Sequence, residues 1–319
     1  MTLTELAKLA HVSTSTASKA FALSPEVNTE TRDMIFEIAK QHGCFKKFYR
    51  LEYPGLVFAV ICPEFESTYY SAFISEMQKC LAKYNSETTV ASTGFSIEAE
   101  RRHLEYYQRY NTVDGIILID GRTDVNPKSE IPIATVNHRA EGSGAINVKK
   151  DMHEPIFKAV ENWVKAGVKD IGFIGDPCTN GRRRRVYDAI ECYLGEVNTD
   201  YFVRSDARFE RGGYLGALEL MDKSKLPRAV VCAYDRMATG AMRAFADRGL
   251  KIPEDIAIIG IDDAPASSYT TPSLSSINHR LEQTCKSLAT ALISKIKGEE
   301  YTDVIHITCD LNERESSKI

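Results

Sequence analysis

The chain has 319 residues, of which 43% are hydrophobic and 26% are charged, and its formal net charge is −4 at pH 7. This length allows a small domain followed by a larger two-part body. No apolar run reaches about 18 residues and no signal-peptide pattern opens the chain, so we expect a cytoplasmic protein with no membrane partner. The eight cysteines are scattered without a Cys-x-x-Cys or zinc spacing, which favours reduced thiols and predicts no metal and no cofactor.

The first 43 residues predict a head of three short helices. Apolar residues recur at helical spacing from Leu3 to Ala10, and a tight turn follows at His11-Val12. Ser13 stands at the N-cap position of a second helix that ends at Phe21, and Asn28 caps a third helix that stops at Gly43. Two short helices at this spacing form a helix-turn-helix, whose second helix lies in the major groove of DNA.

The second predicted helix presents small hydroxyl side chains. If Ala17, Ala20 and Phe21 face the core, the residues left outward are Thr14, Ser15, Ser18 and Lys19. Hydroxyl and amide groups at a helix N-terminus bind phosphates, and side chains there reach base edges. On spacing alone, a structural three-helix bundle with a Ser/Thr-rich capping turn remains the alternative. Residues 1–50 carry seven basic against five acidic side chains, which is only a small basic excess.

From Leu56 onward, short β runs alternate with amphipathic helices. The expected strands are Leu56–Ile61, Thr88–Ser92, Gly115–Ile119, Ile133–Val136, Ile171–Ile174, Ala229–Ala233 and Ile256–Ile261. The expected helices are Ser71–Tyr84, Glu98–Tyr110, His153–Ala166, Arg183–Tyr193, Gly213–Met221 and Ala238–Arg248. Such alternation indicates parallel sheets covered by helices. A weak break near Asp151–Pro155 suggests two α/β subdomains, with a ligand cleft at the carboxyl ends of their strands.

Catalytic motifs do not follow any of these strands. There is no phosphate-binding glycine loop and no Gly-x-Ser-x-Gly elbow. Asp262-Asp263 has the composition of a carboxylate pair, but adjacent residues at a strand end point to opposite sides. We therefore expect that the chain is not an enzyme.

The segment from Leu3 to Gly43 resembles the head of the LacI/GalR family of bacterial repressors. That family's pattern is a helix ending in Ala, a Gly-Val-Ser turn, a Thr-Val-Ser-Arg core and a later Val-Ser-x-x-Thr-Arg. The corresponding residues here, with no gap, are Ala10, His11-Val12-Ser13, Thr16-Ala17-Ser18-Lys19 and Val27-Asn28-Thr29-Glu30-Thr31-Arg32.

The resemblance implies that Thr14, Ser15 and Lys19 lie at base-reading positions, and that Ser13, Thr16 and Ser18 lie nearer phosphates. His11 and Lys19 depart from the family's Gly and Arg. Because Lys binds guanine as a point charge rather than through a planar fork, base preference at Lys19 is expected to differ from the family norm.

The resemblance extends over the body. The family's Asn-Asp-x-Met-Ala-x-Gly-Ala-x-Arg-Ala appears as Tyr234 to Ala244, and its Gly-Leu-x-x-Pro-x-Asp-x-x-x-x-Gly-Phe/Tyr-Asp-Asp as Gly249 to Asp263. Pro272 to Ile277 matches its Pro-x-Leu-Thr-Thr-Ile. The implied body is a type I periplasmic-binding-protein fold, with three crossings between two doubly wound parallel-sheet subdomains and a small-molecule effector in the cleft.

The resemblance implies five residues of the effector site, by their correspondence to positions that contact effectors in the family. They are Tyr69, Asn137, Arg182, Tyr234 and Asp262. Carboxylates accept the hydroxyls of a sugar and Arg donates to them, while the run Arg182–Arg185 would also suit a phosphorylated or otherwise anionic sugar.

Structural roles are the alternatives for these residues. Asp262 would then cap its loop, Arg182–Arg185 would form an exposed basic face, and Tyr69 and Tyr70 would be packing residues. We interpret Asp235 as the N-cap of the following helix rather than as a ligand contact.

The linker departs from the family pattern. Members carry Pro-Asn and then a hinge helix that wedges a Leu into the minor groove. Residues 44–55 here are a few residues shorter, lack Pro-Asn, and offer only Leu51 as a wedge.

The sequence therefore predicts an all-α head at 1–43, a shortened linker at 44–55 and an effector-binding, dimer-forming body at 56–319. Its N-subdomain is expected at about 56–150 plus 276–297, and its C-subdomain at about 151–275 plus 298–319. The predicted function is that of a homodimeric repressor that binds operator DNA and responds to a sugar-like effector. A stand-alone solute-binding protein is the alternative.

Overall fold

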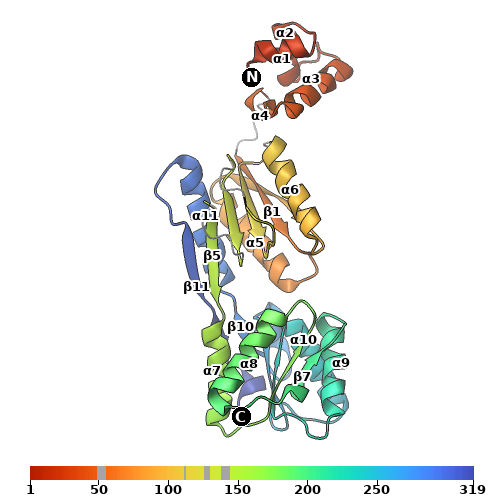
Figure 1. The fold of residues 1–319 in the computed structure, drawn as a ribbon, viewed down its shortest axis with the longest axis vertical. Coiled ribbons are helices and arrows are strands. Elements are labelled where there is room, and N and C mark those ends of the chain that lie inside the picture. The colour runs from red at the N-terminus through yellow and green to blue at the C-terminus, as the bar shows by residue number, and fades with distance from the viewer. Residues whose placement is uncertain (49–54, 111–112, 126–129, 138–143) are drawn as a thin grey trace. The chain divides into compact units, whose positions relative to one another are not determined.

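The computed structural model describes residues 1–48, 55–110, 113–125, 130–137 and 144–319. The chain divides into two compact units, which are treated separately below (Figure 1). Unit 1 contains Met1–Lys149 and Glu282–Ile305, and unit 2 contains Lys150–Leu281 and His306–Ile319. The chain thus passes three times between the units, and the predicted helical head and two α/β subdomains are confirmed.

The head contains the three predicted helices, α1 (Leu3–Leu9), α2 (Thr14–Phe21) and α3 (Thr29–Gln41). The Ser13 hydroxyl accepts the Thr16 N–H at 3.0 Å, and the Asn28 side chain accepts the Thr31 N–H at 2.8 Å. Both predicted N-caps therefore satisfy amides that the first helical turn leaves without a partner. The core of the head consists of Leu6, Ala10, Ala20, Phe21, Val27, Ile35, Ala39 and Cys44.

Two residues that helical spacing assigns to the core face of the head are exposed. Leu9 keeps 47% of its surface in contact with solvent and Met34 keeps 42%. Each lies at the edge of its helix's apolar stripe, and a bundle of three short helices buries only the centre of such a stripe.

A short fourth helix, α4 (Phe45–Phe48), extends the head into the predicted linker. The Phe36 ring lies 5.2 Å from the Phe21 ring and 5.0 Å from the Phe45 ring, with the last pair edge-to-face. Such aromatic contacts contribute beyond simple burial, so residues 45–48 belong to the head. The remaining linker residues 49–54, including Leu51, lie outside the described part of the chain.

Unit 1 contains a six-stranded sheet in the order β11-β5-β4-β3-β1-β2. The pairs β1–β2, β1–β3, β3–β4 and β4–β5 are parallel. Its strands are β1 (Leu56–Cys62), β2 (Ser86–Ser92), β3 (Gly115–Ile119), β4 (Ile133–Val136), β5 (Ile146–Asp151) and β11 (Val304–Thr308). Its helices are α5 (Thr68–Ala82), α6 (Ile97–Tyr110) and α11 (Leu281–Lys297). The apolar runs of β3 and β4 are buried along their whole length, as expected of parallel strands covered on both faces.

Unit 2 contains a second six-stranded sheet in the order β12-β10-β9-β8-β6-β7, in which only the β10–β12 pair is antiparallel among those described. Helices α8 and α9 lie on opposite sides of it (Figure 1). Its strands are β6 (Ile171–Gly175), β7 (Phe202–Arg204), β8 (Ala229–Cys232), β9 (Ala257–Asp262), β10 (Ser275–Asn278) and β12 (Asp310–Asn312). Its helices are α7 (His153–Lys165), α8 (Asn180–Leu194), α9 (Phe209–Met221) and α10 (Asp235–Asp247), with 3-10 turns at Thr199–Tyr201, Pro265–Tyr269 and Glu315–Ser317.

The two sheets share one winding pattern. Each begins with a strand that is flanked by the next two strands of its unit, β1 by β2 and β3, and β6 by β7 and β8. The winding direction therefore reverses beside β1 and beside β6. In open parallel sheets, ligands bind outside the carboxyl ends of the strands at such a reversal. The residues that follow β1, β3, β6 and β8 are therefore candidates for ligand binding.

The second and third crossings lie farther along the chain than expected. Strand β10 pairs with β9 in unit 2, and β11 joins the sheet of unit 1, so the crossings follow Leu281 and Ile305 rather than lying near 276 and 298. The reason is strand pairing, which an apolar pattern does not reveal for a segment as polar as Ser275–Asn278.

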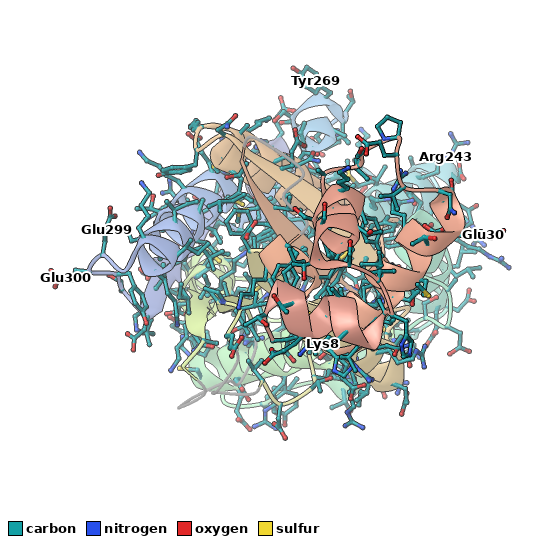
Figure 2. All side chains as sticks on the ribbon, turned by 90° about the horizontal axis from the view of Figure 1, so that it is seen from above. Lys8, Glu30, Arg243, Tyr269, Glu299 and Glu300 are labelled. Atoms are coloured by element: carbon teal, nitrogen blue, oxygen red, sulfur yellow. The ribbon has the colours of Figure 1, made fainter. Side chains whose placement is uncertain are left out.

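Exposed side chains surround both units. In Figure 2, Tyr269 of unit 2 and Glu299 and Glu300 of unit 1 project outward, and Tyr269 is 87% exposed. Within the described ranges, no helix is long and apolar enough to cross a membrane.

Candidate DNA-reading surface and effector site

The helix α2 exposes the residues expected to read DNA. Ala17, Ala20 and Phe21 are buried, and the side chains that remain exposed on this helix are those of Thr14, Ser15, Ser18 and Lys19. Ser13 caps the helix, and its hydroxyl lies 2.8 Å from that of Thr16. The polar face predicted from the sequence is therefore present, with Ser13 and Thr16 at the end where backbone amides suit a phosphate.

Lys19 is in contact with an acidic residue that the sequence analysis did not single out. Its ammonium group pairs with the carboxylate of Glu26, in the loop between α2 and α3. The side chains are 46% and 66% exposed, so the pair is accessible from solvent. In the sequence, only the opposite charges of Lys19 and Glu26 indicate this contact, because a separation of seven residues across a loop does not specify one.

Arg182 and Asp262 meet at the carboxyl end of the sheet in unit 2. The Arg182 Nη2 lies 3.3 Å from the Asp262 Oδ1, and a second nitrogen of the same guanidinium donates to the Ala233 carbonyl. The Nε2 atom of His279 lies 3.1 Å from the same Asp262 oxygen. Two predicted effector residues, 80 positions apart in sequence, are thus brought together by α8 and β9.

Tyr234 completes this cluster at the start of α10. Its ring centre lies 4.8 Å from the Arg182 guanidinium and 5.9 Å from that of Arg208, distances at which a cation interacts with an aromatic face. The Arg208 Nε in turn lies 3.2 Å from the Asp176 Oδ2, directly after β6. Arg208, Asp176 and His279 were missed by the sequence analysis, because only the fold brings their segments together.

Burial changes the acid–base properties of this cluster. It raises the pKa of Asp262 to about 6, despite the attraction of Arg182, which lowers it. Burial also raises the pKa of Tyr234 to about 12, so its hydroxyl stays protonated at neutral pH. The cluster therefore offers guanidinium donors, a phenol and carboxylate acceptors in a poorly solvated place, which suits a ligand rich in hydroxyl groups.

Only the first of the four consecutive arginines reaches this cluster. Arg183 lies over the Phe202 ring at 5.6 Å, Arg184 pairs with Asp188 at 2.7 Å, and Arg185 donates to the Gly181 carbonyl at 3.1 Å. The helical rotation of α8 turns the other three away, which separates Arg182 from an otherwise exposed basic face.

Asp235 does not cap α10 as interpreted from the sequence. Tyr234 occupies the N-cap position, and Asp235 is buried. Its carboxylate accepts the Ser267 hydroxyl and the Ala264 N–H, both at 2.7 Å, and the Ser276 hydroxyl at 2.5 Å. Asp235 thus holds the loop that follows Asp262 in place. These hydrogen bonds to residues distant in sequence outweigh its local preference for an N-cap position.

The neighbouring carboxylates of Asp262 and Asp263 face different partners. Both residues have left-handed backbone angles, with φ of 123° and 50°. Asp263 accepts from Arg314 at 2.7 Å and from Asn278 at 2.7 Å, which ties the end of β9 to the C-terminal segment. The pair therefore does not share a proton, as the strand geometry indicated.

In unit 1, Asn137 contacts Asp120, while Tyr69 contacts Tyr70, which also binds Asp120. The Asn137 amide donates to one Asp120 oxygen at 2.9 Å and the Tyr70 hydroxyl donates to the other at 2.7 Å. Tyr69 is buried with its ring edge-on to that of Tyr70 at 5.3 Å. Asp120 follows β3 beside the winding reversal, and it is the carboxylate that the sequence analysis missed in this unit.

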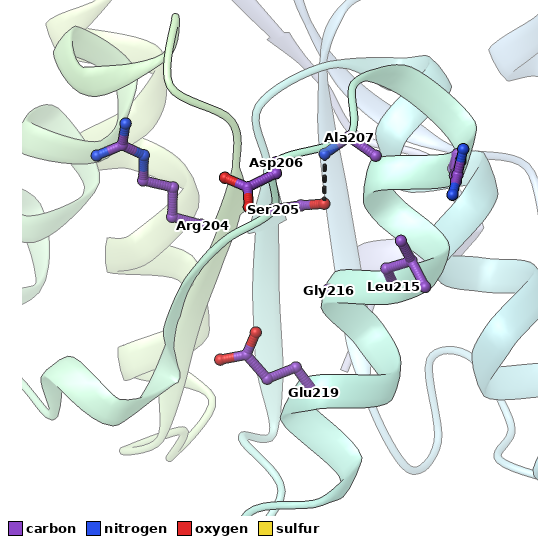
Figure 3. Close-up of a pocket in the computed structure, with 8 residues that line it drawn as sticks. Arg204, Ser205, Asp206, Ala207, Leu215, Gly216 and Glu219 are labelled. Carbon is purple, nitrogen blue, oxygen red and sulfur yellow. Dashed lines mark hydrogen bonds between the residues drawn. The ribbon is translucent and has the colours of Figure 1, made fainter.

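A separate hollow of about 500 Å³ lies beside β7 and α9 (Figure 3). It is lined by Arg204, Ser205, Asp206, Ala207, Arg211, Leu215, Gly216 and Glu219. Its charged side chains are exposed and of both signs, and the Ser205 hydroxyl is engaged by the Ala207 N–H at 3.2 Å. Because its charged groups are solvated, this hollow lacks the buried donors and acceptors that the cluster around Arg182 provides.

Known proteins share this organisation. Residues 160–317 match the model of a periplasmic binding protein-like domain. The chain is 27% identical to the probable HTH-type transcriptional repressor ExuR of Bacillus subtilis, over 94% of this chain and 93% of that protein. It is 25% identical to the ribose operon repressor of Haemophilus influenzae, over 98% of each.

Solved structures agree in fold over the whole length. The lac repressor dimer bound to operator and an anti-inducer superposes with a TM-score of 0.71 at 17% identity, covering 100% of this chain and 99% of that one. The complex of the regulator CelR with cellobiose gives 0.68 at 22% identity, with 99% of each chain covered.

A helix-turn-helix head on a periplasmic-binding-protein-like body defines a transcription regulator. The relatives named above are repressors rather than enzymes, and they match over the head as well as the body. The chain resembles the repressors of the LacI/GalR family over both its head and its body.

Proposed function

We propose that the chain is a cytoplasmic homodimeric repressor that reads an operator with its two heads. The observation that carries the proposal is the formed helix-turn-helix, with capped α2 and an exposed face of Ser15, Ser18 and Lys19. One such head reads only a half-site, so two-fold symmetry is needed to supply the second. The match to named repressors over both head and body supports this arrangement.

The proposed effector is a small polyhydroxylated molecule. In unit 2, Arg182, Tyr234 and Asp262 supply donors, an aromatic face and an acceptor for it, and in unit 1 Tyr69 and Asn137 are the residues assigned to it. A carboxylate or phosphate on the sugar would be recognised by the guanidinium of Arg182, and the guanidinium of Arg208 also lies near the Tyr234 ring. Ligand binding to the body is expected to alter how the two heads engage DNA.

A stand-alone solute-binding protein is the competing function for this body. The exposed polar face of α2 favours a regulator, because a solute-binding protein does not need a surface that binds DNA. DNA binding distinguishes the two, since a solute-binding protein would take the ligand without retaining any duplex.

The first test combines two measurements on the full chain. Selection from a randomised duplex library should enrich a two-fold symmetric sequence, and a thermal-shift screen against sugars, sugar acids, sugar phosphates and nucleobases should identify the effector. A ligand at 100 times its Kd stabilises the folded state by about 2.7 kcal/mol, which is a readily measured shift. Enrichment of no duplex would refute the proposal.

A further inference from the structure

The ion pair between Lys19 and Glu26 lies on the face of the head that the proposed function assigns to DNA. Ser15 and Lys19 are four residues apart on α2, so their side chains share one face of the helix. Lys19 brings the Glu26 carboxylate to this face. A carboxylate in such a position is unexpected, because it would approach a phosphate backbone that repels it.

The loop that carries Glu26 is held in place by contacts on both sides of it. One nitrogen of the Arg32 guanidinium donates to the Ser24 carbonyl at 3.0 Å and to the Val27 carbonyl at 2.9 Å. The Glu26 N–H donates to the Ser24 hydroxyl at 3.3 Å, and the Ser24 N–H donates to the Lys19 carbonyl at 3.0 Å. The backbone of Glu26 is therefore fixed relative to the end of α2, although its side chain is exposed.

Stability gives little reason for this pair. Ion pairs between exposed side chains typically contribute less than about 1 kcal/mol to folding. The head has a second pair of the same kind, between Lys40 and Glu37 at 2.9 Å, with side chains 40% and 61% exposed. That second pair lies on α3 and provides an internal comparison for the first.

The chemistry of the pair matches one base pair in the major groove. There guanine presents two acceptors, N7 and O6, and cytosine presents one donor, its N4 amino group. These groups lie side by side in a G·C pair, as the ammonium donor of Lys19 and the carboxylate acceptor of Glu26 lie side by side in the head. Lysine alone is a flexible point charge that defines a base poorly.

We propose that Lys19 and Glu26 act together as a reader of one G·C base pair in each half-site, with Lys19 on guanine and Glu26 on the cytosine amino group. Glu26 is thus a specificity-determining residue, and it also limits the directions available to Lys19. The inference rests on the proposed function, because it requires that α2 enter the major groove.

The test uses the full-length protein and a randomised duplex library that accommodates two half-sites about 10 base pairs apart. Wild type, Glu26→Gln, Glu26→Ala and the matched control Glu37→Gln are compared by the sequences that they enrich. Wild type and the control should select a G·C pair at the same position of each half-site. Both Glu26 variants should lose about tenfold of the preference at that position, while keeping the others.

A base analogue then tests the contact from the side of the DNA. N4-methylcytosine keeps its pairing but replaces the amino hydrogen in the major groove with a methyl group. Placed at the selected position, it should weaken wild type about tenfold and leave Glu26→Ala unaffected.

Different outcomes distinguish a failure of this inference from a failure of the proposed function on which it rests. If wild type enriches an operator but the Glu26 variants keep the same preference at every position, or the analogue weakens wild type and Glu26→Ala equally, the paired reader is refuted. If wild type enriches no duplex, the proposed function itself fails. Because the analogue experiment needs only wild type to reveal a contact, a poorly folded variant does not remove the test.

Discussion

Replacing Asp262 with Asn is expected to stabilise unit 2 at neutral and alkaline pH. The carboxylate is buried, and even with Arg182 at 3.3 Å its pKa is raised from 3.8 to about 6. The desolvation of the ionised form therefore outweighs its attraction to the guanidinium, as in many buried ion pairs. Asn has the same shape, keeps an oxygen for Arg182 and carries no charge.

The magnitude and the pH window follow from the pKa. A difference of about two pH units corresponds to about 3 kcal/mol, at about 1.4 kcal/mol for each unit. The folded-state pKa lies above that of the unfolded chain, so the cost of Asp262 is absent below about pH 4, grows as pH rises and is complete above about pH 6. Asp262→Asn should thus gain up to about 3 kcal/mol at pH 8 and little at pH 4.

Urea unfolding of both proteins at several pH values, followed by circular dichroism, measures this difference. The control is Asp247→Asn, because Asp247 is exposed and paired with Arg243 at 2.9 Å, which contributes to lowering its pKa. The control should lose a little stability at neutral pH rather than gain it. An Asp262→Asn protein that is less stable than wild type at pH 8 would show that the attraction to Arg182 outweighs desolvation, and the reasoning would be wrong.

Four further outcomes are expected. Ser15→Ala or Lys19→Ala should weaken operator binding by about 1 to 3 kcal/mol and relax specificity, and unchanged discrimination in gel-shift titrations of both would contradict their assignment. Asp262→Ala should abolish the response to effector while operator binding persists; calorimetry with undiminished affinity would remove Asp262 from the site. The protein should sediment as a dimer without DNA, and a monomer at micromolar concentration in analytical ultracentrifugation would exclude that assembly. Leu51→Ala should cost little operator affinity, and a strong operator bend that the substitution abolishes, seen with circularly permuted fragments, would show that a minor-groove wedge exists after all.

Most periodic segments were predictable from the sequence because local pattern and tertiary packing agree there, although helix α11 was not among the expected helices. In α7, the apolar residues Ile156, Ala159, Val160 and Trp163 recur at helical spacing, and all are buried. The strands not predicted are β5, β7, β10, β11 and β12. Of these, β10 and β12 are three or four residues long and largely polar. Their strand conformation comes from pairing with one another and with β9, which is a property of the assembled sheet.

The same distinction applies to the candidate site. Arg182 and Asp262 were predicted from the positions that they match in the family, and the structure brings their side chains together. Arg208, Asp176 and Asp120 carry no local signal, since each becomes part of a site only when the winding of a sheet places it at a strand end. Asp235 was predicted wrongly for the opposite reason. Its strong local preference for an N-cap position is overridden by hydrogen bonds from serines about 30 and 40 positions away.

The inclusion of Phe45–Phe48 in the head shortens the segment that joins the head to β1. Only residues 49–55 lie between α4 and Leu56. A tether of that length spans at most about 25 Å when extended, but only about 11 Å when it is coiled as a helix. For any segment of seven residues, forming a helix thus more than halves the greatest distance that the segment can span. The separation of the two half-sites in an operator, and not its base sequence alone, should therefore decide whether a helix can form there.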